Sequence, residues 1–225
     1  MSELRLPAVI VNFKAYAEVE GAGALRLAEA CQEVAEQTGV SIVVCPPATS
    51  LGEISRVATI PVYAQHVDAR RPGAATGRLT PELIRATGAK GSLINHSEHR
   101  LLLADIGAVV TMCRENDLTT VVCTDTSATS AGAASLGPDF IAVEPPELIG
   151  GNISVTDAQP EVVEHTVKAV QRIDENVRVL CGAGIKTGRD VKRAVELGAD
   201  GVLLASGVVK AKEPTKALAD LVQYL

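Results

Sequence analysis

Eight short apolar runs, each followed by a stretch with helical pattern, divide the 225-residue chain into repeating strand–helix units. The runs are rich in Val, Ile and Leu without regular polar alternation, which is typical of strands buried on both faces. They lie at residues 8–13, 40–45, 62–66, 92–95, 119–123, 140–143, 177–181 and 201–205. Alternation of this kind specifies a parallel sheet. We therefore predict an α/β fold with one domain over residues 1–225, a closed (β/α)8 barrel, with a doubly wound open sheet as the alternative.

The intervening segments predict helices of uneven length. We expect them at residues 17–37, 49–57, from 81 onwards, 98–115, 127–134, from 156 or 157 to 174, 187–197 and 214–224. The chain is shorter than the roughly 250 residues of a typical (β/α)8 barrel. Some outer helices should therefore be shortened, or another subunit should cover part of the outer surface.

Composition restricts the class of protein further. The net charge of −6 and an aromatic content of 2% argue against a nucleic-acid-binding surface. No apolar stretch approaches the roughly 20 residues of a membrane span, and the N-terminus lacks a signal-peptide pattern. The five cysteines are odd in number, form no Cys-x-x-Cys and lie mostly inside apolar runs. We expect reduced, buried thiols in a soluble cytoplasmic protein.

The sixth apolar run ends in a carboxylate at Glu144. Pro145 follows and favours an extended conformation at Glu144, so the strand should stop there and leave this side chain at its tip. The segment continues to Gly150-Gly151-Asn152, stiff at its start and permissive at its end, as in a hinged lid. The alternative is a solvated Glu in an ordinary loop.

Other strand tips also carry polar residues or glycines. The first strand ends near Asn12 and Lys14, the fourth at Asn95–Glu98, and the seventh and eighth at Gly182–Gly184 and Ala205–Gly207. Active sites of such barrels lie at the carboxyl ends of the strands, so these groups should meet. Taken singly, Lys14 could be a solvated cation, the histidine a structural residue, and the glycines plain turns.

Metal binding by His96 and His99 is a further alternative, but only Glu98 lies nearby in sequence. The glycines instead suggest a phosphate site, because main-chain N–H groups beside a short helix bind anions. With a phosphorylated ligand, the polar trio suits proton abstraction next to a carbonyl. Glu144 would take the proton, His96 would donate to the enediolate oxygen, and Lys14 would offset its charge.

The chain resembles the triosephosphate isomerase family over essentially its whole length, and three segments carry the resemblance. Asn12–Lys14, Asn95–Arg100 and Val143–Gly150 match the family's signature segments in order and on the expected strands. The third segment and the short chain are most similar to the archaeal members. The resemblance implies interconversion of dihydroxyacetone phosphate and D-glyceraldehyde 3-phosphate without a cofactor or a metal.

The resemblance also implies roles for single residues. As in the established mechanism of this family, Glu144 would be the base, His96 the neutral electrophile, and Lys14 and Asn12 electrostatic partners. Glu98 would pair with Lys14. The residues around the substrate phosphate would be Ile149, Gly150, Gly184, Ala205, Ser206 and Gly207. We expect Ser97 to cap a helix that begins beside His96, whose N–H groups would disfavour a protonated imidazole.

The chain departs from the family pattern at two places. Gly151 and Asn152 stand where the lid hinge commonly has Thr and Gly, which predicts a looser hinge. Ala205-Ser206 replaces a common glycine pair, which puts phosphate affinity in doubt. The loop at residues 65–77 resembles the family's interdigitating loop, so we expect a homodimer or homotetramer.

Two other functions stay open at this stage. One is another phosphate-sugar barrel, such as an epimerase or a prenyl-glyceryl phosphate synthase. This reading would explain the phosphate-side glycines but not the trio of Glu144, His96 and Lys14. The other is a catalytically idle phosphate-binding barrel, whose signature would be the loss of a member of the trio.

Overall fold

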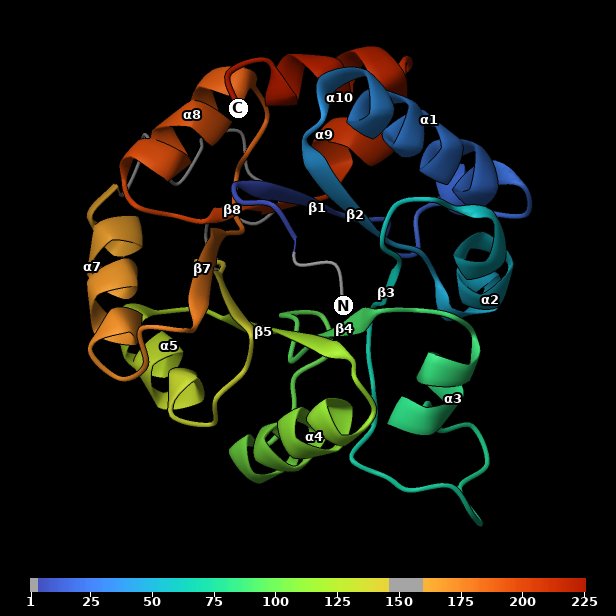
Figure 1. Ribbon diagram of the computed structural model, residues 1–225, viewed down its shortest axis with the longest axis vertical. Helices are drawn as coiled ribbons and strands as arrows, with labels where there is room; N and C mark the ends of the chain where they lie inside the picture. Colours follow the sequence, from blue (N-terminus) through green and yellow to red (C-terminus); the bar gives the residue numbers. More distant parts are fainter. Residues whose placement is uncertain (1–3, 146–159) are drawn as a thin grey trace.

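The computed structural model describes residues 4–145 and 160–225, and their eight strands form one parallel sheet (Figure 1). The strand order is β2-β1-β8-β7-β6-β5-β4-β3. A parallel bridge between Val44 of β2 and Val62, directly before β3, joins the two outer strands. The sheet therefore closes into a barrel, which confirms the barrel prediction over the open sheet. The strands are β1 (Ala8–Asn12), β2 (Ser41–Cys45), β3 (Tyr63–Ala64), β4 (Gly91–Ile94), β5 (Thr119–Thr124), β6 (Phe140–Val143), β7 (Arg178–Cys181) and β8 (Gly201–Leu204).

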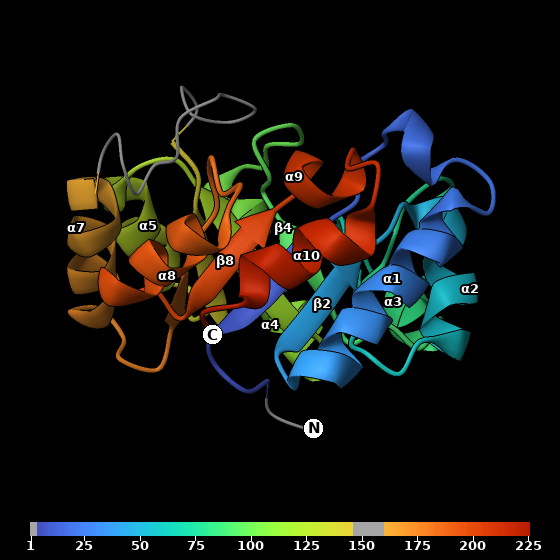
Figure 2. The same ribbon diagram turned by 90° about the horizontal axis from the view of Figure 1, so that it is seen from above.

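Helices surround the barrel as an outer ring (Figure 1). The ring consists of α1 (Gly23–Thr38), α2 (Ala48–Val57), α3 (Pro81–Ala86), α4 (Leu103–Glu115), α5 (Ser127–Ala134), α7 (Pro160–Gln171), α8 (Gly188–Glu196) and α10 (Pro214–Val222). Two short helices, η1 (Ala17–Val19) and α9 (Ser206–Val209), lie at the edge where the strands end (Figure 2). With six residues in α3 and eight in α5, the expected shortening of outer helices is present.

The barrel interior is filled by every second residue of the strands. Successive side chains of a strand point to opposite faces. One buried cluster contains strand residues from all eight strands and no helix residue, so it is the barrel interior. Its members are Ile10, Val43, Cys45, Tyr63, Leu93, Val121, Cys123, Phe140, Ala142, Leu180 and Leu203. The same alternation carries Asn12 and Glu144 inward at the barrel mouth, two residues beyond Ile10 and Ala142.

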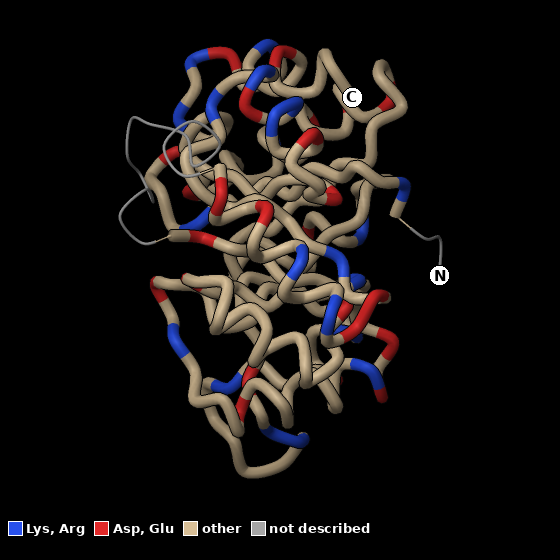
Figure 3. The backbone as a smooth tube through the Cα atoms, turned by 90° about the vertical axis from the view of Figure 1, so that its left-hand side faces the viewer, with Lys and Arg blue, Asp and Glu red and all other residues tan. Residues whose placement is uncertain are grey.

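The second buried cluster lies between the barrel and the helices. It joins the other strand faces, such as Val9 and Val11, to helix residues such as Leu27, Val109 and Val191. Burial of this kind stabilises a fold by about 25 cal/mol per Å² of apolar surface. Charged residues of both signs are found mainly on the outer helices and loops (Figure 3).

Two predicted helices begin later than the sequence pattern suggested. The segment predicted as one helix over 17–37 is η1 followed by α1, because Glu20 is extended and Gly21 has φ 52°. A Cβ on Gly23 would also meet the carbonyl oxygen of Glu18. The segment predicted over 98–115 is helical only from Leu103, since Leu102 is still extended.

Other boundaries differ less. The third strand is limited to Tyr63–Ala64. Directly after it, the side-chain amide of Gln65 donates to the carbonyls of Lys14 and Cys45, each at 2.9 Å. The predicted cap at Thr156 or Asp157 lies outside the described residues. Thr187 caps α8 by accepting from the N–H of Asp190 in a reciprocal capping box.

All five cysteines are buried and free, as predicted. Burial raises the pKa of the thiols of Cys31, Cys113 and Cys181 to about 12. These thiols are therefore protonated and unreactive at neutral pH. Within the described part of the chain, no helix combines the length and apolar character that crossing a bilayer requires.

Candidate active site

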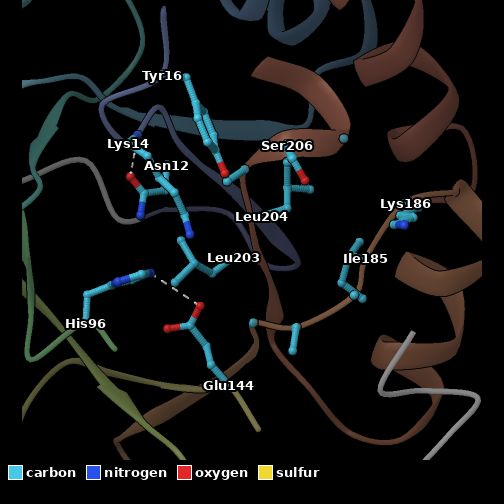
Figure 4. Close-up of a pocket in the computed structure, with 15 residues that line it drawn as sticks. Asn12, Lys14, Tyr16, His96, Glu144, Ile185, Lys186, Leu203, Leu204 and Ser206 are labelled. Atoms are coloured by element: carbon cyan, nitrogen blue, oxygen red, sulfur yellow. Dashed lines mark hydrogen bonds and ion pairs between the residues drawn. The ribbon is translucent and has the colours of Figure 1, made fainter. Parts of the chain in front are cut away.

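A pocket opens at the carboxyl ends of the strands and collects most of the predicted site residues (Figure 4). Among the described residues, its lining is Asn12, Lys14, Tyr16, His96, Glu144, Gly182, Ala183, Gly184, Ile185, Lys186, Leu203, Leu204, Ala205, Ser206 and Gly207. We call Asn12, Lys14, His96 and Glu144 the acid–base side, and Gly184, Ala205, Ser206 and Gly207 the anion side. Ile149 and Gly150, predicted phosphate ligands, and the hinge at Gly151 and Asn152 lie outside the described residues.

The end of β1 places Asn12 and Lys14 on one face of the pocket. Asn12 is 5% exposed, and its Oδ1 accepts from the N–H of Lys14 at 2.9 Å. Lys14 has φ 51°, a left-handed conformation that is uncommon for a residue with a side chain. The Asn12 side chain and the Gln65 amide, which donates to the Lys14 carbonyl, together hold this strained turn. Strain of this kind concentrates at functional sites.

The Lys14 side chain turns towards the loop after β4. Its Nζ lies 2.7 Å from Oε1 of Glu98, a short charge-assisted contact. Glu98 is 58% exposed in its side chain, so solvent screens this pair, and its main effect is to fix the direction of the ammonium group.

His96 sits in a tight turn directly after β4, and not at a helix N-terminus. This corrects the prediction that Ser97 caps a helix there, because α4 begins only at Leu103. Asn95 shapes the turn with φ 61°. Its amide donates to the Cys123 carbonyl at 2.9 Å, and its Oδ1 accepts from the N–H of Leu101 at 2.8 Å. The loop is therefore tied at both ends around His96.

The turn also fixes the tautomer of His96. The N–H of Glu98 donates to Nδ1 of His96 at 3.1 Å, so Nδ1 has no proton and Nε2 carries it. Burial, reinforced by the Lys14 ammonium, lowers the pKa of the His96 imidazole to about 4. His96 is therefore neutral at physiological pH, with Nε2–H directed into the pocket.

Glu144 extends inward from the tip of β6. It is 5% exposed, and its own N–H donates to the Thr124 carbonyl at 2.7 Å. Burial raises the pKa of this carboxyl to about 7, against the lowering effects of the Cys123 thiol and Lys14. One carboxylate oxygen, Oε2, is buried without a hydrogen-bond partner among the described residues. An unpaired buried acceptor is costly, which is typical of a group kept ready for a ligand.

The position of Glu144 depends on a glycine of the next strand. A Cβ on Gly182 would lie 2.4 Å from Cγ of Glu144 and 3.1 Å from the Val143 carbonyl oxygen. Gly182 has no left-handed backbone angle, so it is required here for space alone. The sequence marked Gly182 as a strand-end glycine but gave no sign of this contact.

His96 and Glu144 face each other across the pocket, with Nε2 and Oε1 3.6 Å apart (Figure 4). One is a neutral N–H donor with a lowered pKa, and the other is a carboxyl that loses its proton near neutral pH. A pair with its pKa values moved in opposite directions can divide the roles of proton acceptor and hydrogen-bond donor. A carbonyl compound bound between them would have a C–H near one group and an oxygen near the other.

The anion side is formed largely by backbone at the ends of β7 and β8. Gly184 has φ 70°, and Ala205 turns sharply with ψ −85° before α9 begins at Ser206. The first N–H groups of a helix have no acceptor within the helix. All four predicted anion-side residues that the structure describes line the same pocket as Glu144.

The metal-site alternative finds no support in the position of His99. Its ring stacks on His66 with centroids 3.9 Å apart, away from the His96–Glu144 pair. Among residues 4–145 and 160–225, no three His, Cys, Asp or Glu side chains gather in a metal-binding arrangement.

Sequence reasoning missed several residues of the pocket. Tyr16, Ile185 and Lys186 line it from the loops after β1 and β7. Their signal would have been their place four or five residues beyond a strand tip. Gln65 was assigned to a strand, although its side chain braces the Lys14 turn.

Similarity to known proteins extends over almost the entire chain. The sequence model of the family described as triosephosphate isomerase matches residues 7–225. A triosephosphate isomerase of Methanothermus fervidus is 54% identical over 216 residues, covering 96% of this chain and 97% of the relative.

Two further relatives give the same picture. A triosephosphate isomerase of Methanoculleus marisnigri is 53% identical over 219 residues, covering 97% of this chain and 99% of its own. A triosephosphate isomerase of Methanocaldococcus jannaschii is 51% identical over 217 residues, which cover 96% of this chain and 99% of the relative.

Proposed function

Because the chain belongs to the triosephosphate isomerase family, we propose that it interconverts dihydroxyacetone phosphate and D-glyceraldehyde 3-phosphate through an enediolate. Glu144 is the base and His96 the electrophile. The observation that carries this assignment is the buried contact of 3.6 Å between Glu144 and the Nε2 of His96, with pKa values moved in opposite directions.

The reaction moves one proton between neighbouring carbons. The Glu144 carboxylate removes a proton from C1 of dihydroxyacetone phosphate, while Nε2–H of His96 donates a hydrogen bond to the C2 oxygen. The electron pair of the broken C–H bond forms the C1–C2 double bond of the enediolate. The carbonyl pair moves onto the C2 oxygen, which takes the Nε2 proton of His96, and the Nε2 atom then takes the C1 hydroxyl proton. Protonated Glu144 returns a proton to C2, the C1 oxygen becomes the aldehyde oxygen, and both residues regain their starting protonation states.

The environment of each group supports its role. A base works best when its pKa lies near the working pH, and burial brings Glu144 to about 7. A neutral imidazole is closer in acidity to an enediol than an imidazolium is, so it stabilises the oxyanion without trapping it. Lys14 and Asn12 lie beside the same pocket, where the Lys14 ammonium offsets negative charge.

We assign the substrate phosphate to the anion side. Gly184, Ser206 and Gly207 line the pocket after β7 and β8, the place where barrels of this kind bind phosphate. We assign the phosphate contacts to their main-chain N–H groups. The substrate would then extend from the anion side to the His96–Glu144 pair.

The loop at residues 65–77 is the part we assign to subunit contact. Residues 70–74 at the tip of the loop are exposed. Nearer the barrel, the Asp68 carboxylate accepts hydrogen bonds from the N–H of Leu79 at 2.7 Å and from the Arg78 guanidinium at 2.9 Å. A loop with an exposed tip and hydrogen-bonded ends is suited to insertion into a second copy of the chain. Light scattering on the purified protein measures the result, with a dimer or a tetramer expected.

A coupled assay with both triose phosphates tests the function. We expect fast turnover in both directions, unchanged by a chelator, because the proposed step transfers only a proton. Ribulose 5-phosphate and prenyl-acceptor substrates serve as comparisons for the other phosphate-sugar barrels. Folded protein that converts neither triose phosphate would contradict the proposal, and turnover of a comparison substrate would support a rival.

A further inference from the structure

Tyr16 lines the pocket but has no part in the mechanism described above. It follows Lys14 by two residues in the loop between β1 and η1 and is half-buried. Its ring extends towards Ser206, with the hydroxyl end directed between Asn12 and Ser206 (Figure 4). The phenol therefore reaches from the acid–base side to the anion side.

A lysine from the opposite end of the chain holds this ring in place. Nζ of Lys210, the residue after α9, lies 4.1 Å from the centroid of the Tyr16 ring. An ammonium group within about 6 Å of an aromatic face is attracted to it. The contact joins the loop after the first strand to the loop after the eighth, which are neighbours because β1 pairs with β8.

The charges around the ring favour an anion. Lys14 is already paired with Glu98, whereas no carboxylate of the described residues forms an ion pair with Lys210. The one acidic residue of the described lining is Glu144, on the acid–base side. Lys210 therefore adds positive charge beside the Tyr16 ring in a protein with a net charge of −6.

We propose that the Tyr16 hydroxyl donates a hydrogen bond to the phosphate group of the substrate, and that Lys210 positions the ring and adds attraction for the dianion. The identity of the substrate rests on the proposed function, but the chemistry recognised is that of any phosphate monoester. A phenol O–H is a good donor to a charged oxygen, and such bonds are stronger than neutral ones. Tyr16 thus adds a side-chain donor to a site otherwise built from backbone.

Binding of inorganic phosphate, measured by calorimetry, tests this without any turnover. Tyr16→Phe keeps the ring and its contact with Lys210 but removes the donor, and we expect about 10-fold weaker binding or more. Lys210→Gln should weaken binding about 3-fold or more, with a smaller salt dependence. The matched control is Lys192→Gln, which removes an exposed lysine 5.7 Å from the Tyr224 ring, far from the pocket, and should change nothing.

Turnover separates a phosphate role from a structural one. Tyr16→Phe should raise KM for dihydroxyacetone phosphate and leave slow proton exchange of D-glyceraldehyde, which has no phosphate, within about 2-fold. Equal losses on both compounds, or unchanged phosphate binding by Tyr16→Phe, would overturn the proposal. If the wild-type protein binds phosphate in a Tyr16-dependent manner without isomerising triose phosphates, this inference stands and the proposed function fails. A wild type that binds no phosphate overturns the inference.

Discussion

On the acid–base side of the pocket, named hydrogen bonds hold Asn12, Lys14 and His96, and the space left by a glycine positions Glu144. On the anion side the backbone itself forms much of the wall. Asn12 fixes the Lys14 turn, and the Glu98 N–H fixes the ring of His96. Gly184 and Ala205 contribute through their backbone angles instead.

This difference predicts which substitutions in the pocket should reduce activity most. The acid–base side depends on single atoms, because its groups are buried and have few alternative partners. The anion side depends on the course of the backbone, so removing a side chain there should matter less than adding one. The following predictions test this contrast, in order of decreasing effect.

Glu144→Gln should produce the largest change. An amide of the same shape cannot accept the substrate proton, so kcat should fall by at least about 10²–10⁴-fold, the contribution of a positioned base. Burial raises the pKa of Glu144 to about 7, so the charged carboxylate destabilises the folded state as the pH rises through that value. At pH 8 the melting temperature of the variant should therefore equal or exceed that of the wild type.

Steady-state kinetics and thermal melting measure both effects. A variant that keeps more than a tenth of wild-type kcat would remove Glu144 from the role of base. A melting temperature at pH 8 well below that of the wild type would contradict the expected effect of Glu144 on stability.

Gly182→Ala should be the next most damaging. The new Cβ would lie 2.4 Å from Cγ of Glu144 and push the carboxyl away from His96. A displacement of about 1 Å can cost about 100-fold in rate, so we expect a loss of about 10- to 100-fold, mainly in kcat.

Gly132→Ala is the matched control for this change. Gly132 lies within α5, and an added Cβ there would meet nothing within 4 Å. Alanine is the better helix former, so this variant should keep its activity and melt at an equal or higher temperature. Similar kinetics for both variants would show that Gly182 does not position Glu144.

The pH profile of kcat/KM, calculated on the concentration of the substrate's phosphate dianion, should show one enzyme group on the acid side. This correction removes the step of the phosphate monoester itself, whose second pKa is about 6. In the proposed mechanism ionised Glu144 is the active form, so the rate should fall up to about tenfold per unit below its pKa of about 7. His96, with a pKa of about 4, stays neutral and adds no second step above pH 5. A second acid-side step near pH 6.5 would mean that His96 titrates normally and that the turn does not keep it neutral.

Ser206→Ala should have the smallest effect. If the anion side works through main-chain N–H groups, loss of the hydroxyl should change KM by no more than about threefold. Inhibition by inorganic phosphate provides an independent reading. A tenfold or larger loss of affinity would show that the hydroxyl itself binds the phosphate and would weaken the contrast between the two sides.

Much of the architecture could be predicted from the sequence, because period-two alternation determines which strand residues face inward. Asn12 and Glu144 follow from that pattern once β1 and β6 are placed. The break between η1 and α1 could not be predicted from the sequence. A single glycine is compatible with an amphipathic helix, and the positive φ of Gly21 that interrupts the helix is visible only in the structure.

The reason for a neutral His96 was predicted wrongly. A helix start at Ser97 looked plausible because the pattern leading to α4 is continuous, but the Nδ1 of His96 takes the N–H of Glu98 and keeps the segment in a turn. The Lys14–Glu98 pair, which the family resemblance implied, is present, but the other side-chain contacts between distant segments gave no sequence signal. The space between Gly182 and Glu144, and the contact of Lys210 with Tyr16, required the closed barrel.

The central claim is that Glu144 moves a substrate proton while His96 supports an enediolate. Isomerisation of D-glyceraldehyde 3-phosphate in D2O, followed by NMR, tests it most directly, because a proton held by a carboxyl exchanges with solvent. We predict deuterium on the carbon next to the product carbonyl with the wild type, and neither conversion nor exchange with Glu144→Gln. Product formed without any deuterium, or exchange that persists in the variant, would contradict the account.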